Sequence, residues 1–303
     1  MSNKQLLYIA GPTAVGKTAV SVALAQSLNT EIISCDARQC YREMTLGTAV
    51  PTVAERQGIP HHFIQNKSIH QAFDAGAFEK EGLLLLERLF KTYDRVVMVG
   101  GSGLYAQALM EGLDEFPQID PEAARQVKAL YRAQGLEGLQ KALKEKDPQY
   151  YKRVDLHNPR RMIRALEVCQ TAKKPYSDFL GQSPKKRPFA THTLRLSLPR
   201  ELLYHRINQR VDQMVRAGLE AEARDLYPHK NLPALQTVGY QEWFAHFDGS
   251  STRQEAIAAI QKNTRRYAKR QLTWLGARPT PEIDMQKPEN ALKKALEILE
   301  NTF

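Results

Sequence analysis

The chain has little cysteine and no long apolar run, and both scarcities narrow what it can be. Its three cysteines, Cys35, Cys40 and Cys169, form no C-x-x-C pair and no cluster with histidine. We therefore expect neither a disulfide framework nor a zinc site, and we interpret the cysteines as packing residues in a reducing compartment. No run of about 18 apolar residues occurs, so we expect no membrane span. The N-terminal stretch lacks the pattern of a signal peptide, which favours a cytoplasmic location.

Acidic residues are also in short supply relative to basic ones. The 303 residues carry 43 Lys and Arg against 33 Asp and Glu, a formal net charge of +10. The excess is concentrated, because seven basic residues and one acid, Glu255, lie between Arg253 and Arg278. Plain solubility explains a modest positive charge, whereas a concentrated basic block favours a nucleic-acid partner.

Apolar runs and helical periods alternate in the first third of the chain. "QLLYIA", "TEIISCD" and "DRVVMVGGSG" are typical of buried strands, while "TAVSVALAQSL" and "EGLLLLERLFKTY" have helical spacing. The alternation predicts an α/β fold with a parallel sheet that is covered by helices on both faces.

Helical patterns dominate from residue 113 to about 190. Asp120-Pro121 and Asn158-Pro159 are helix-start signals, and Gly135 marks a helix end. Strand spacing then returns in "THTLRLSLPR", and a last long helix is expected from Thr252, whose hydroxyl can form a capping box with Glu255. We predict an α/β core at 1–112 and 191–303, interrupted by a helical insertion domain at 113–190.

A phosphate-binding loop of the G-x-x-x-x-G-K-T type lies between the first predicted strand and helix. Its backbone N–H groups and the helix N-terminus would hold phosphate, Lys17 would reach a terminal phosphate, and Thr18 would offer a hydroxyl to Mg²⁺. The residues predicted to bind phosphate are Gly11, Pro12, Thr13, Ala14, Val15, Gly16, Lys17 and Thr18. The motif predicts a P-loop core and phosphate binding, but not hydrolysis.

An acid is missing where a triphosphate-splitting enzyme of this architecture usually has one. The strand "VVMVGGSG" ends without a carboxylate, and Asp36 follows "EIISC" instead. At the carboxyl end of a parallel strand Asp36 would point into the ligand crevice, where it can accept a proton. On spacing alone, an outer Mg²⁺ ligand or a turn cap is an equal alternative.

Nine segments together resemble one family, the tRNA dimethylallyltransferases, also called tRNA isopentenyltransferases. They are "GPTAVGKT", "IISCDARQCY", "LGTAVP", "IPHHFI", "VGGSGLYAQALMEGL", "NPRRMIRALEV", "RINQRVDQMVRAGLEAE", "TVGYQEW" and "AKRQLTWL". The resemblance runs from about residue 6 to 276. It is bacterial in type, because the chain lacks the cysteines of the zinc finger that eukaryotic relatives add.

The resemblance implies an activity. Such enzymes transfer a dimethylallyl group from dimethylallyl diphosphate to N6 of the adenosine 3′-adjacent to the anticodon, and release diphosphate. By similarity Asp36 is the base that takes the N6 proton, and the phosphate loop holds the diphosphate with Mg²⁺ near Thr18. Lys17 and Arg210 would stabilise the leaving group, and Ser102 would bind substrate.

The resemblance also implies the tRNA-binding residues. The stretch Asp36, Ala37, Arg38 and Gln39 would receive the flipped base together with Ser102, and Gln39 would pair with adenine. Further contacts are implied for Asn158, Pro159, Arg160, Arg161 and Met162, and for Lys269, Arg270 and Gln271. Many relatives have Ser in place of Ala37, so the hydroxyl contact that they could make there is not expected here. Many also have Arg in place of Gly276, so one phosphate contact is either missing or moved to Arg278.

The last long helix places Lys262, Arg266, Lys269 and Arg270 on one face. Tyr267 and Trp274 interleave with them, and each is expected either to stack on a base or to pack in the core. The insertion domain is expected to close over the anticodon stem-loop of tRNA, with the two substrates entering one channel from opposite ends. We expect a monomer.

Three other functions are weighed against this one. A P-loop kinase for a small molecule explains the loop but not the basic helix or "DARQCY". A prenyltransferase acting on free adenine nucleotides would not need the large positive charge. An RNA-binding module that uses nucleotide as a switch would be excluded by transfer in the absence of nucleoside triphosphate.

Overall fold

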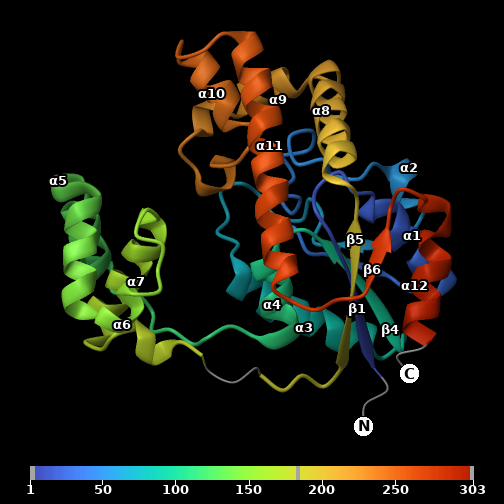
Figure 1. Ribbon diagram of the computed structural model, residues 1–303, viewed down its shortest axis with the longest axis horizontal. Helices are drawn as coiled ribbons and strands as arrows, with labels where there is room; N and C mark the ends of the chain where they lie inside the picture. The colour runs from blue at the N-terminus through green and yellow to red at the C-terminus, as the bar shows by residue number, and fades with distance from the viewer. Residues whose placement is uncertain (1–3, 182–184, 301–303) are drawn as a thin grey trace. The chain divides into compact units, whose positions relative to one another are not determined.

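The computed structural model describes residues 4–181 and 185–300 and divides the chain into two compact units (Figure 1). The first comprises Met1–Glu111 and Lys186–Phe303, and the second comprises Gly112–Lys185. The predicted bounds of the insertion were 113 and 190, and those of the second unit are 112 and 185. Residues 186–190 belong to the first unit, because they lead directly into β5, Ala190–Ser197.

The first unit is built on one parallel sheet. Within the described residues its strands run in the order β3-β2-β4-β1-β5-β6, and every pairing is parallel, which confirms the predicted class. The bounds are β1 Gln5–Ala10, β2 Ile32–Ser34, β3 His61–His62, β4 Arg95–Gly100, β5 Ala190–Ser197 and β6 Glu282–Asp284. The sequence analysis did not predict β3 and β6, which are too short to show a strand period.

Helices cover the sheet on both faces. α1 packs against α12 on one side, and α3 packs against α4 on the other (Figure 1). The helices are α1 Lys17–Ser27, α2 Val53–Arg56, α3 Ala75–Leu89, α4 Gly103–Glu111, α8 Arg200–Arg216, α9 Leu219–Leu226, α10 Gln241–Phe247, α11 Arg253–Gly276 and α12 Ala291–Glu300. The capping box of Thr252 with Glu255 at the start of α11 is confirmed. α3 begins before the predicted residue 81, because the Asp74 side chain caps it by accepting a hydrogen bond from Ala77 N.

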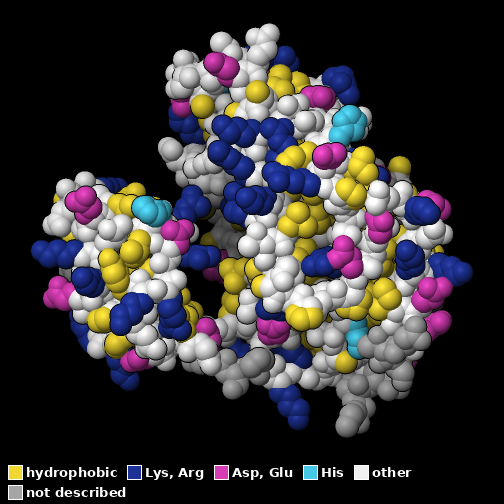
Figure 2. Space-filling view, viewed as in Figure 1, with side chains coloured by type: hydrophobic (Ala, Val, Ile, Leu, Met, Phe, Trp, Pro, Cys, Tyr) yellow, Lys and Arg dark blue, Asp and Glu magenta, His cyan; other side chains and the backbone are white. Residues whose placement is uncertain are grey.

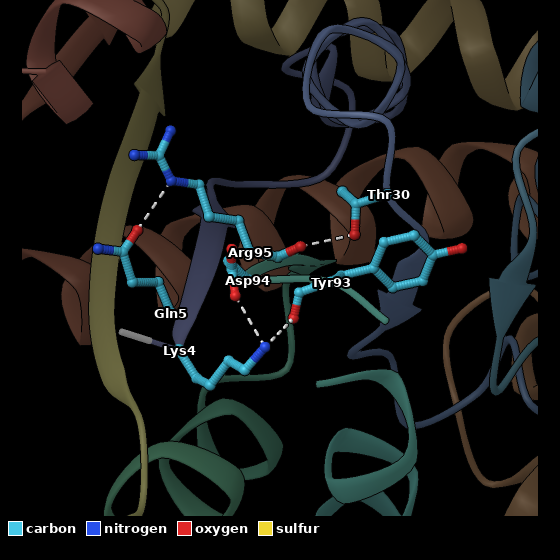
Figure 3. A network of polar contacts seen from close by, with 6 residues as sticks. All are labelled: Lys4, Gln5, Thr30, Tyr93, Asp94 and Arg95. Atoms are coloured by element: carbon cyan, nitrogen blue, oxygen red, sulfur yellow. Dashed lines mark hydrogen bonds and ion pairs between the residues drawn. The ribbon is translucent and has the colours of Figure 1, made fainter. Parts of the chain in front are cut away.

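Polar contacts fasten the amino ends of the central strands (Figure 3). The Lys4 ammonium pairs with Asp94 at 2.8 Å, and Arg95 Nε donates to Gln5 Oε1 at 3.0 Å. Thr30 Oγ1 donates to the Arg95 carbonyl at 2.6 Å. These side chains stabilise the amino edge of the sheet. In open α/β sheets ligands bind at the carboxyl ends of the strands, so the candidate site is expected at the opposite edge.

The second unit is helical. It contains α5 Pro121–Lys146, α6 Pro148–Tyr151 and α7 Pro159–Ala172, and α5 is kinked at Gly135, whose φ of 60° suits glycine. Both predicted helix starts are confirmed, since Asp120 caps α5 and Asn158 caps α7. Its core includes Val127, Leu139, Leu143, Met162 and Leu166. None of the described helices in either unit is long and apolar enough to cross a membrane.

Candidate active site

The phosphate loop connects β1 to α1 and is shaped by left-handed backbone. Ala14 has a φ of 67° and Gly16 a φ of 105°, and Gly16 is the residue before α1 begins. The first N–H groups of a helix have no partner within the helix, and the helix dipole makes this end positive. The loop is therefore suited to bind an anion in front of α1.

Lys17 lies across this loop. Its ammonium donates to the carbonyl oxygens of Gly11 at 3.0 Å and Pro12 at 2.9 Å. Burial lowers the pKa of Lys17 to about 8, while the negative charge of Asp36 acts to raise it and the positive charge of Arg210 to lower it. Asp36 and Arg210, which were predicted with Lys17, thus both lie within electrostatic reach of the Lys17 ammonium. Arg210 lies on α8, where burial lowers the pKa of its guanidinium and nearby Glu55 raises it.

Asp36 follows β2 at the carboxyl edge of the sheet. The chain here is held close to β4, since Cys35 N donates to the Val99 carbonyl at 2.7 Å. A Cβ atom at Gly100 would lie 1.9 Å from the Cys35 carbonyl oxygen, so this approach requires glycine. Asp36 Oδ1 accepts hydrogen bonds from Arg38 N at 2.9 Å and from Gln39 N. Asp36 is therefore a turn cap, and the cap fixes a carboxylate that can also accept a proton.

Ser102 joins the turn after β4 to the Asp36 loop. Its Oγ accepts a hydrogen bond from Ala37 N at 3.0 Å, and it lies close enough to Tyr267 of α11 to influence the pKa of that phenol. Burial and then the negative charge of Asp36 raise the pKa of Tyr267. Tyr267 is thus half-buried and lies within electrostatic reach of Asp36, a position that its spacing on a basic helix did not reveal.

Gln271 links the phosphate loop to the turn after β4. Its amide oxygen accepts from Thr13 N at 2.9 Å, and its Nε2 donates to the Gly101 carbonyl at 3.0 Å. The residue is 7% exposed. Our sequence analysis assigned Gln271 to tRNA contact, whereas in the structure both ends of its amide are occupied by the protein.

Gln39 is held in a comparable way. Its Nε2 donates to the carbonyl oxygens of Thr48 at 3.1 Å and Ala49 at 2.9 Å. Its Oε1 accepts a long hydrogen bond from Ser34 Oγ at 3.4 Å. Pairing of this amide with adenine, as the resemblance implies, would have to replace the bonds of Nε2 or the weaker bond of Oε1. The segment 45–49 therefore decides how Gln39 is presented.

The outer face of α11 is basic. Lys262, Arg266, Lys269 and Arg270 are all exposed, and Figure 2 shows Lys and Arg side chains gathered over this helix. Arg270 also lies over the Tyr267 ring, 5.7 Å from its centroid. The predicted face is therefore present at the surface and available to a polyanion.

Trp274 and Arg278 are engaged inside the first unit. A Cβ atom at Gly103 would lie 2.3 Å from the Trp274 ring, and the Arg278 guanidinium lies 4.9 Å from the centroid of that ring. Arg278 also pairs with Glu111, with Nη2 3.0 Å from Oε2. Arg278 was a candidate for the phosphate contact of the arginine that many relatives have in place of Gly276. Its guanidinium is instead paired with Glu111.

The segment 158–162 starts α7 of the second unit. Asn158 Oδ1 accepts from Arg161 N at 3.2 Å, and Pro159 occupies the first helical turn. Arg160 and Arg161 are exposed, whereas Met162 is 0% exposed and belongs to the core of this unit. The two arginines are the members of this segment that present charge to solvent.

Metal ligands are sparse around the loop. Among residues 4–181 and 185–300 no group of three or more His, Cys, Asp or Glu side chains could hold a metal. Thr18 stands in the first turn of α1, next to Lys17. One hydroxyl beside the phosphate loop fits Mg²⁺, which keeps several waters and is usually held together with substrate phosphates.

Comparison with known proteins places the chain in a family. The sequence model of IPP transferase matches residues 39–278. The tRNA dimethylallyltransferase of Flavobacterium johnsoniae is 52% identical over 89% of this chain and 90% of its own length, and that of Christiangramia forsetii is 50% identical over 99% of both. The crystal structure of the tRNA isopentenylpyrophosphate transferase of Bacillus halodurans superposes with a TM-score of 0.72 at 34% identity, covering 98% of this chain and 96% of that one.

A phosphate loop after β1 and a carboxylate after β2, at the same edge of the parallel sheet, suit a group-transfer enzyme that acts on a phosphorylated donor. The chain belongs to the IPP transferase family.

Proposed function

We propose that the protein is a tRNA dimethylallyltransferase. It transfers the dimethylallyl group of dimethylallyl diphosphate to N6 of the adenosine 3′-adjacent to the anticodon and releases diphosphate. Membership of the IPP transferase family and about 50% identity to enzymes named for this activity support the proposal.

Two observations support the mechanism. Asp36, the proposed base, lies near the phosphate loop, and no acidic residue that could direct a water molecule follows β4. Asp36 and Arg210 both act electrostatically on Lys17. β4 ends at Gly100, and Gly101 and Ser102 follow it without a carboxylate. This arrangement supports the departure of diphosphate next to a proton acceptor rather than attack of water on a γ-phosphate.

The chemical step balances within these groups. The lone pair of adenine N6 forms a bond to C1 of the allylic donor, and the C1–O bond breaks with its electron pair going to the diphosphate. Asp36 takes the N6 proton as the amine becomes positive. The loop N–H groups, protonated Lys17 and Arg210 stabilise the charge that develops on the diphosphate.

Mg²⁺ is the proposed cofactor, with Thr18 as its ligand from the protein. When bound, it would neutralise charge on the diphosphate oxygens. Lys17 and Arg210 orient the diphosphate, while Asp36 and Ser102 lie toward the acceptor base.

The tRNA is proposed to lie on the basic residues of α11, chiefly Lys269 and Arg270, and on Arg160 and Arg161 of the second unit. The target base must leave its stack, and the loop of Asp36, Ala37, Arg38 and Gln39 is proposed to receive it. The second unit is proposed to close on the anticodon stem-loop. The protein is proposed to act as a monomer, and its tRNA substrate favours a cytoplasmic reaction.

The experiment is to incubate the protein with Mg²⁺, dimethylallyl diphosphate and unmodified tRNA, digest the tRNA and weigh its nucleosides. The proposal expects an adenosine heavier by one five-carbon unit, formed only when the donor is present. Unchanged nucleosides under conditions in which the protein binds both substrates would refute it.

A further inference from the structure

Three consecutive backbone N–H groups converge on one carboxylate, that of Glu222 on α9. Glu222 Oε2 accepts from Thr45 N at 3.0 Å and Leu46 N at 2.7 Å, and Oε1 accepts from Gly47 N at 2.9 Å. Hydrogen bonds from N–H groups to a carboxylate are among the stronger ones in proteins. Glu222 therefore anchors the segment 45–47 to a helix that is remote from it in the sequence.

Tyr240 completes this anchor. Its hydroxyl donates to Glu222 Oε1 at 2.7 Å, and the residue is 0% exposed. A Cβ atom at Gly47 would lie 2.5 Å from the Tyr240 ring, so the segment passes the ring at a distance that only glycine allows. The segments "LGTAVP", "RAGLEAE" and "TVGYQEW", to which the proposed chemistry gives no role, thus meet at one point.

The anchored segment continues directly into the carbonyl groups that hold Gln39. Thr48 O and Ala49 O accept the two hydrogen bonds of Gln39 Nε2. Ala49 has a φ of 52°, a left-handed conformation that residues with a Cβ rarely adopt, so its carbonyl direction must be fixed by the surroundings. Gln39 N in turn donates to Asp36 Oδ1 at 3.2 Å.

We propose that Glu222 is a positioning residue for base recognition. By anchoring 45–47 it aims the carbonyls of Thr48 and Ala49, and these set the orientation of Gln39 beside the candidate base. The inference rests on the proposed function and deepens it, because it assigns a residue outside the site to the selection of the adenine edge.

Glu222→Gln is the sharp variant, because it keeps the shape and replaces one acceptor oxygen by an NH₂ group. Whichever way the amide turns, at least one of the backbone donors of 45–47 then faces a donor. We expect kcat/KM for tRNA to fall about tenfold or more. KM for dimethylallyl diphosphate should stay within about twofold, because the phosphate loop makes no contact with the anchor.

The matched control is Glu220→Gln on the same helix. Glu220 forms surface ion pairs with Arg253 at 2.8 Å and Arg224 at 3.5 Å, and it does not contact 45–47. It should leave both kinetic constants unchanged. Hydrogen exchange gives a readout independent of activity: the amides of 45–47 should exchange faster in Glu222→Gln than in the wild type or in Glu220→Gln.

A double-mutant cycle with Gln39→Ala decides whether Glu222 acts through Gln39. The inference expects Glu222→Gln to cost little more once Gln39 is truncated, whereas an equal loss in both backgrounds overturns it. Equal losses for both substrates would also overturn it.

Should Glu222→Gln fold poorly, Tyr240→Phe, which removes one bond and keeps the ring, must show the same pattern with a smaller, several-fold loss. A wild-type protein that forms no prenylated adenosine refutes the proposed function instead, and the exchange measurement then still tests the anchor.

Discussion

At the scale of single residues, the site is a set of charges whose environments differ. Lys17 is half-buried over a loop that also carries the positive end of α1, while Asp36 is fixed by two backbone N–H groups in a turn. The ammonium is thereby held at low solvation and the carboxylate is held in one direction. Each environment leads to a measurable consequence.

Replacing Asp36 with Asn should remove the base and keep the loop. An asparagine Oδ1 can still accept from Arg38 N and Gln39 N, so the turn should survive. We expect the rate of transfer to fall by about a hundredfold or more, the usual contribution of a general base. Affinity for tRNA, measured by filter binding, should stay within about threefold. A variant with near-normal turnover would contradict the role of Asp36.

The pKa of Lys17 predicts how donor binding depends on pH. Burial lowers this pKa to about 8, and a bound diphosphate, being negative, must raise it again. Affinity for dimethylallyl diphosphate should therefore be constant between about pH 7, where the diphosphate is fully ionised, and pH 8. It should decline as pH rises above 8 and be accompanied by proton uptake near pH 8. Calorimetry in buffers of different ionisation enthalpy measures both effects. In Lys17→Ala the proton uptake near pH 8 should vanish, and its persistence would assign the titration to another group.

At the scale of secondary-structure elements, α11 has two faces with different duties. Its inner face carries Tyr267 and Gln271, which contact Ser102 and the phosphate loop, and its outer face carries the exposed basic residues. The helix therefore couples the donor side of the site to the surface proposed for tRNA.

Gln271→Ala separates a loop clasp from a tRNA contact. If the Gln271 side chain links Thr13 to Gly101, its removal should raise KM for dimethylallyl diphosphate about tenfold, because one N–H group of the phosphate loop is no longer fixed. As a tRNA contact only, its loss would raise KM for tRNA and leave the donor unaffected. Steady-state kinetics with each substrate varied in turn distinguishes the two.

Lys269→Ala with Arg270→Ala tests the outer face. Removing two cations should weaken tRNA binding and reduce the slope of log affinity against log salt by about one to two, while KM for the donor stays constant. Binding isotherms at four salt concentrations measure the slope. Lys294→Ala, an exposed lysine on α12, serves as the control, and an equal effect there would mean that only net charge matters.

The sequence predicts the phosphate loop and several helix starts, but it does not predict the long-range contacts that position the site. Glycine and capping signals locate the phosphate loop and the starts of α5, α7 and α11, because such devices are local. The clasp of Gln271 and the anchor of Glu222 are not predicted, since each joins residues that are more than 170 positions apart in the chain. Asp36 is foreseen as base or cap, and only the structure shows the cap.

At the scale of the whole molecule, two compact units contribute charge to one proposed substrate. Arg160 and Arg161 are exposed on the second unit, and the basic face of α11 belongs to the first. Each of these exposed basic surfaces, taken by itself, suits a polyanion. The net charge of +10 is then a property of the binding surfaces rather than of solubility alone.

The most direct test of the central claim is a competition between ATP and dimethylallyl diphosphate in one reaction. The protein is supplied with tRNA, Mg²⁺, ATP and dimethylallyl diphosphate, and the consumption of each compound is followed by mass spectrometry. The account predicts one dimethylallyl diphosphate consumed and one diphosphate released for each prenylated adenosine, with ATP intact. Rapid loss of ATP with unmodified tRNA and undiminished dimethylallyl diphosphate would contradict it.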